Sequence, residues 1–122
     1  MLVYNDYLKD LGVTKNTYPL GNSCSHETEL DKVSGVIPCQ TWNLNLTLAM
    51  ELYTYLRAFK DIKPGHPACL KSMEEWDKIL DEMIEGFADY IKRRDDVSLN
   101  QDNSKLNRSL NLMKEWWEAF WW

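Results

Sequence analysis

The chain has 122 residues, of which 44% are hydrophobic and 27% are charged, and its formal net charge is −5. This length fits one domain with a core of its own, and the composition argues against an intrinsically disordered chain. No run approaches the roughly 20 apolar residues of a membrane-spanning helix, and no secretory signal opens the chain, so we expect a cytosolic protein. The acidic balance disfavours direct nucleic-acid binding, which needs clustered Lys and Arg, but it suits a basic protein partner.

The first 40 residues carry little periodic pattern. Residues Tyr4 to Leu11 can form one or two turns of helix, which Gly12 would end in a left-handed cap. Prolines and glycines then interrupt both helical and strand periods up to residue 40. We therefore expect one domain, residues 1–122, in which an irregular N-terminal segment (1–40) packs on a helical core (41–122).

The first strong helix is predicted from about Trp42 to Lys60, with Thr41 as its N-cap. Its most regular apolar stripe follows helical spacing, and the stripe predicts the face that is buried in the core. The stripe consists of Leu44, Leu48, Leu52, Tyr55 and Phe59.

The second helix is predicted to begin at Ser72 and to end near Arg94, after a proline-containing break at residues 63–67. Ser72 and Glu75 match the capping-box pattern, and acids in the first turn with bases in the last agree with the helix dipole. Its stripe consists of Trp76, Leu80, Met83, Phe87 and Tyr90.

A polar connector separates this helix from a last one, which starts near Asp102 or Ser104. The last stripe consists of Leu106, Leu110, Met113, Trp117 and Phe120, and the chain then closes on Trp121 and Trp122. No βαβ pattern is present, so the sequence predicts an all-α three-helix bundle.

The order of these motifs resembles small uncharacterised helical proteins of tailed bacteriophages. The resemblance rests on the Trp42-Asn-Leu-Asn45 start of a helix, the Gly65-His-Pro67 turn, the run Glu75-Trp-Asp-Lys-Ile-Leu-Asp-Glu-Met-Ile84 and the aromatic C-terminus, and it spans about residues 35–122. This sequence has Asn45 where that pattern usually has Asp. The resemblance brings no established activity; it implies a phage gene expressed in the host bacterial cytoplasm.

Cysteine and histidine residues offer little chemistry. Zinc would suit thiolate and imidazole ligands, but Cys24, His26, Cys39, His66 and Cys69 lack the spacing of common zinc modules, so no metal site is expected. Cys69 lies three residues after His66, yet nothing supplies the orienting group or oxyanion site of a catalytic pair. We predict no catalytic residue, no cofactor and no enzymatic activity.

Two surfaces remain as candidates for binding. The acids of the second helix, represented by Glu74, Glu75, Asp81 and Glu85, could imitate a nucleic-acid backbone in the basic groove of a partner, although an ordinary solvated helix face has the same composition. The closing tryptophans cannot all face one core stripe. We therefore expect self-association, a dimer first, through Trp116, Trp121 and Trp122.

These features lead to the hypothesis of a non-enzymatic phage accessory protein that inhibits a host or anti-phage defence factor, of which CRISPR-type systems are one class. An alternative is a protein that sequesters a signalling nucleotide, with Trp42 stacking on the base and Asn43 and Asn45 donating hydrogen bonds. A virion or assembly factor is the third possibility.

Overall fold

The computed structural model describes residues 2–15, 41, 43–94 and 101–121. Its regular elements in these ranges are all helical, which confirms the predicted all-α class. They are α1 (Asp6–Asp10), α4 (Leu44–Ile62), α5 (Met73–Lys92), α6 (Ser104–Glu115) and the 3-10 turn η1 (Trp117–Ala119). None of the helices in this part of the chain combines the length and the apolar character that crossing a bilayer requires.

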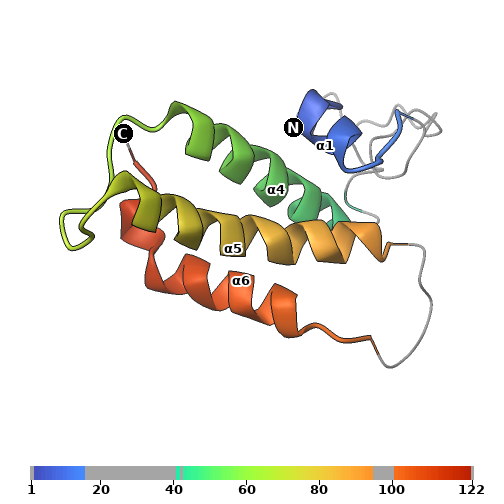
Figure 1. The fold of residues 1–122 in the computed structure, drawn as a ribbon. Coiled ribbons are helices and arrows are strands. Elements are labelled where there is room, and N and C mark those ends of the chain that lie inside the picture. Colours follow the sequence, from blue (N-terminus) through green and yellow to red (C-terminus); the bar gives the residue numbers. More distant parts are fainter. Residues whose placement is uncertain (1, 16–40, 42, 95–100, 122) are drawn as a thin grey trace.

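Helix α5 is the centre of the fold (Figure 1). Helices α4 and α6 pack along it and run in the opposite direction to it, while α1 lies against α4. The three main helices therefore form the predicted bundle, arranged as a layer with α5 in the middle.

The central position of α5 follows from its sequence. Trp76, Leu80, Met83 and Phe87 are at most 1% exposed, as the stripe predicts. The Ser72 hydroxyl caps the helix by accepting a hydrogen bond from the Glu75 amide at 3.2 Å. Ile84, Gly86 and Ile91 are buried as well and widen this face, so the helix can pack against two neighbours.

Helix α4 buries a different face from the one predicted. The buried residues are Thr47, Ala49, Met50, Tyr53 and Leu56. The predicted core residues Leu44, Leu48 and Tyr55 are 51%, 46% and 59% exposed. Leu52 and Phe59 of the predicted stripe are partly buried and pack against the core. The helix is apolar on two faces, and periodicity alone does not decide which of them the neighbouring elements cover. The N-cap is Asn43 and not Thr41.

Helix α6 is also rotated relative to the prediction. Met113 of the predicted stripe is buried, and Leu106 and Phe120 are partly buried against the core. Ser109 and Leu112 are buried in place of Leu110 and Trp117, which are 47% and 63% exposed. The reason is a close contact with α5 at Gly86, where an added Cβ would overlap Ser109 and the Lys105 carbonyl. The Ser109 hydroxyl donates to the Met83 carbonyl at 2.7 Å. Ser109 is polar and does not contribute to a hydrophobic pattern, yet it determines which face of α6 is buried.

The described part of the N-terminal segment packs on α4. Asn5 caps α1, and its amide donates to the Thr54 hydroxyl at 3.2 Å. Leu8 is fully buried, and Gly12 has a φ of +86°, the left-handed conformation predicted for it. Residues 16–40, which make up most of the predicted irregular segment, lie outside the described residues.

Candidate functional site

Most acids of α5 form surface ion pairs with basic side chains of this chain. Asp81 pairs with Lys60 of α4 at 2.7 Å, and this hydrogen bond raises the pKa of the lysine. On the opposite side Glu85 pairs with Lys105 of α6 at 3.1 Å, which likewise raises the pKa of Lys105. Two of the four predicted partner-binding acids are therefore paired with basic side chains of the neighbouring helices, and both remain more than half exposed.

The other two predicted acids differ from this pair. The Glu75 carboxylate accepts a hydrogen bond from the Lys71 amide at 2.9 Å and so belongs to the helix start. Glu74 is exposed and forms no ion pair with any described residue. One acid of the four is thus left available to a partner, which weakens the case for nucleic-acid mimicry by this face.

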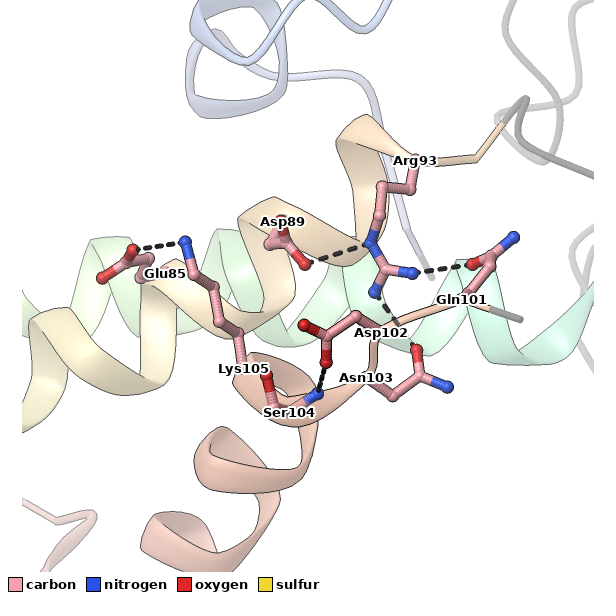
Figure 2. A network of polar contacts seen from close by, with 8 residues as sticks. All are labelled: Glu85, Asp89, Arg93, Gln101, Asp102, Asn103, Ser104 and Lys105. Carbon is pink, nitrogen blue, oxygen red and sulfur yellow. Dashed lines mark hydrogen bonds and ion pairs between the residues drawn. The ribbon is translucent and has the colours of Figure 1, made fainter. Parts of the chain in front are cut away.

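A polar network fixes the start of α6 against the end of α5 (Figure 2). The Arg93 guanidinium donates to Asp89 at 3.0 Å, to Gln101 at 2.7 Å and to Asn103 at 3.2 Å. The Asp102 carboxylate accepts from the Ser104 amide at 2.9 Å, and this bond lowers the pKa of Asp102. The network is structural, because its donors are used within the chain.

The C-terminal aromatic residues separate onto two sides of η1. Trp116 is half-buried, with its ring centroid 5.5 Å from that of Trp76. Trp117 lies beside Phe120, and the two rings form an edge-to-face pair at 6.3 Å. Trp121 is 77% exposed. Of the predicted self-association residues, Trp116 packs within its own chain, Trp121 is accessible, and Trp122 lies outside the described residues.

Trp116 and Trp121 border a hollow of about 480 Å³ between the α4–α5 loop and the end of α6, here called the C-terminal pocket. Trp76 also contributes to its wall, and the loop supplies residues 64–69 on the other side. Two carboxylates, those of Glu115 and Glu118, complete the lining, and no Lys or Arg is part of it.

The chemistry of this pocket suits a cation. Glu115 and Glu118 are exposed and, within the described chain, neither forms an ion pair, in contrast to the paired acids of α5. Indole faces attract ammonium and guanidinium groups through the ring quadrupole. An aromatic wall with carboxylates at its edge therefore offers both kinds of cation contact in one place.

His66 and Cys69 line the same pocket. The His66 Nδ1 lies 2.9 Å from the Pro67 carbonyl oxygen. The Cys69 thiol is free and exposed. Cys24, His26 and Cys39 fall outside the described residues, and within those described no three His, Cys, Asp or Glu side chains gather to hold a metal ion.

A second hollow, of about 390 Å³, lies on the other side of η1 and is here called the α4 groove. It is bordered by Tyr55, Phe59 and Ile62 of α4 and by Met113, Trp117 and Phe120 of the C-terminal region. All of its lining residues are apolar or aromatic, and they include residues of the stripe that was predicted to be core.

The predicted nucleotide site is only partly described. Trp42 lies outside the described residues, and Asn43 is exposed beside the first turn of α4. The Asn45 amide donates to the Tyr90 hydroxyl at 2.6 Å. One of the two amides expected to recognise a base is therefore engaged within the fold.

Sequence reasoning missed the C-terminal pocket as a unit. The Glu115-Trp-Trp-Glu118 run places two adjacent indoles between two acids, which is a usable signal for a cation site. The contribution of residues 64–69 had no such signal, because it depends on how the α4–α5 loop folds over the end of α6. The chain matches no protein-family model, no curated protein and no solved structure.

Proposed function

We propose that the chain is a non-enzymatic binding protein that holds a basic segment of a protein partner by enclosing an Arg side chain in the C-terminal pocket. One observation carries the proposal: Trp116 and Trp121 share a hollow with Glu115 and Glu118, whose carboxylates have no basic counterpart among the described residues. The net charge of −5 adds long-range attraction for a basic partner.

Arginine fits this pocket better than lysine does. A guanidinium is planar and weakly hydrated, so it can stack on an indole while its edge donates hydrogen bonds to a carboxylate. Trp121 is exposed, so its ring can contact an incoming side chain without breaking core packing. The proposal moves the binding surface from the acids of α5, which are mostly paired, to the end of α6.

For the biological role we keep the hypothesis of an inhibitor of a host or anti-phage defence factor, acting in the bacterial cytoplasm. Its support is the resemblance to small phage proteins together with this cation site. Nucleic-acid-handling proteins, CRISPR-type effectors among them, carry Arg-rich grooves that bind phosphates, and an acidic, aromatic binder can occupy such a groove.

The pocket is tested by tryptophan fluorescence. A short Arg-containing peptide should change the emission saturably, whereas its citrulline counterpart, which has the same shape without the charge, should not. Trp121→Ala and Glu118→Gln should each weaken binding by about threefold to tenfold, the range expected for one cation–π or charge contact. Glu74→Gln is the matched control, since Glu74 lies outside the pocket, and it should bind like the native chain. Equal responses to arginine and citrulline would overturn the proposal.

The inhibitory role has its own test. Expression of the chain in bacteria that carry a CRISPR-type system should raise the number of plaques formed by a targeted phage, and Trp121→Ala should remove that effect. If the chain binds the Arg peptide but leaves plaque numbers unchanged, the proposed cation site stands and the proposed inhibitory role is wrong.

The two other hypotheses predict different outcomes. A nucleotide-sequestering protein should gain thermal stability from a nucleotide and lose that gain in Trp42→Ala. A virion component should copurify with phage particles.

A further inference from the structure

The α4 groove lies beside a second apolar face of α4. One face of this helix packs in the core of the bundle, and the other is largely exposed. Leu44, Leu48, Tyr55 and Ile62 are between 46% and 59% exposed. They follow one another along the same face, and Leu52 and Phe59 lie between them. Isolated exposed apolar residues are ordinary, but a continuous row beside a hollow marks a contact surface.

The row has the spacing of a helix-pairing seam. From Leu48 through Leu52, Tyr55 and Phe59 to Ile62 the intervals are four, three, four and three residues. This is the heptad pattern by which one helix packs against another. The part from Leu48 to Phe59, with intervals of four, three and four, reads the same in both directions, so the seam matches a reversed copy of itself.

We propose that this face, the α4 seam together with the groove beside it, is the interface of a two-fold homodimer in which the two α4 helices pack antiparallel. In this pairing Leu52 lies opposite Tyr55 of the second copy, and Leu48 opposite Phe59 of the second copy. The inference does not depend on the proposed cation site, which lies on the other side of η1.

The charges along the seam favour the antiparallel arrangement. Glu51 is the one ionisable acid or base flanking the central part of the seam, and Ala58 occupies the equivalent position one heptad later. In this register Tyr55 of the second copy lies opposite Leu52, one residue along from Glu51, so its hydroxyl can reach and donate to the Glu51 carboxylate. The two Glu51 carboxylates are then kept apart, and two symmetric hydrogen bonds become possible.

The available apolar area corresponds to a small, reversible interface. With about 200 Å² for an aromatic side chain and roughly 100 Å² for an aliphatic one, the exposed apolar residues of the seam and Trp117 of the groove present about 400 Å² per copy. Two copies would bury about 800 Å² before polar rim contacts are added, which is below the ~1,000 Å² of a stable interface and fits a weak dimer.

Two substitutions of Tyr55, one to an acid and one to a base, test whether the two α4 helices are in contact and whether they are antiparallel. Tyr55→Glu adds a carboxylate to each copy, one residue along from the Glu51 of the other copy, and like charges across an interface repel, so the dimer dissociation constant should rise at least ~100-fold. Tyr55→Lys supplies an opposite charge to the same neighbour and should keep the dimer. Val3→Glu, at a 58% exposed residue of the N-terminal segment that is not part of the α4 seam, is the control for added charge and should leave the mass unchanged.

The measurement is the solution mass of the full chain by sedimentation equilibrium over a range of concentrations, with circular dichroism to verify folding. We expect a dimer for the native chain, for Val3→Glu, for Tyr55→Lys and for Trp121→Ala, and a folded monomer for Tyr55→Glu. A monomeric native chain, or a dimer that Tyr55→Glu leaves intact, overturns the proposal. Loss of the dimer in both Tyr55 variants would overturn the antiparallel pairing, and loss in Trp121→Ala alone would move the interface to the C-terminal pocket.

Discussion

At the scale of single residues, the contact between Gly86 and Ser109 determines how α5 and α6 meet. Gly86 is buried in the middle of a helix, where glycine is normally unfavourable. The absence of a Cβ lets Ser109 reach the Met83 carbonyl, and Ser109 is itself fully buried. Two small residues thus fix the rotation of α6 that the hydrophobic stripe failed to predict.

Gly86→Ala should therefore destabilise the protein although alanine is the better helix former. Its Cβ would meet Ser109 and the backbone carbonyl of Lys105, so the helices must separate, at a cost of about 1–3 kcal/mol. Gly65→Ala, where nothing lies within 4 Å of the added Cβ, is the control and should be nearly neutral. Urea unfolding measures both, and a more stable Gly86→Ala chain would show that the close contact is wrong.

At the scale of elements, α4 illustrates what sequence can and cannot decide. Its existence, its approximate length and its amphipathic character were predictable from spacing. Which of its two apolar faces is buried was not, because both Leu48 and Met50 belong to rows with helical period, and the choice depends on the elements that pack against the helix.

This assignment leads to a paired prediction. Met50→Ala should lower the free energy of unfolding by about 2–5 kcal/mol, since Met50 is fully buried. Leu48→Ala should change it by less than about 0.5 kcal/mol, because it removes exposed surface. Both are measured by urea unfolding at a concentration low enough to keep the chain monomeric. A larger loss of unfolding free energy in Leu48→Ala than in Met50→Ala would mean that the face predicted from the sequence is the buried one.

We predict that the contact between Asp102 and Ser104 at the start of α6 stabilises the protein less in acid. The Ser104 amide holds the pKa of Asp102 below its ordinary value of 3.8, so the folded state binds this proton less readily than the unfolded state. The stabilisation is present above pH 3.8 and is lost as the pH falls through the lowered folded pKa. Asp102→Asn keeps an acceptor oxygen but cannot titrate.

The native chain should consequently lose more thermal stability than Asp102→Asn between about pH 6 and about pH 2.5. The difference between the two melting temperatures at each pH isolates this group from the other carboxylates, which titrate in both proteins. Equal changes in melting temperature across that range would mean that the Asp102 carboxylate does not contribute.

At the scale of the whole molecule, the central placement of α5 explains both candidate surfaces. Because α4 and α6 pack on α5, the acids of α5 are paired on two sides, and the apolar side chains of α4 that face away from α5 stay exposed. The sequence could predict a helical bundle and surplus indoles. It could not predict how η1 divides them, since that depends on the contact of Trp116 with Trp76.

The central claim is that Trp116 and Trp121 form a cation pocket while Trp117 faces the other side. The most direct measurement is a nitrogen–proton correlation spectrum of the indole N–H groups during titration with the Arg-containing peptide. The signals of Trp116 and Trp121 should shift together and saturate, whereas that of Trp117 should stay in place. Movement of Trp117 alone, or of no indole signal, would contradict the claim.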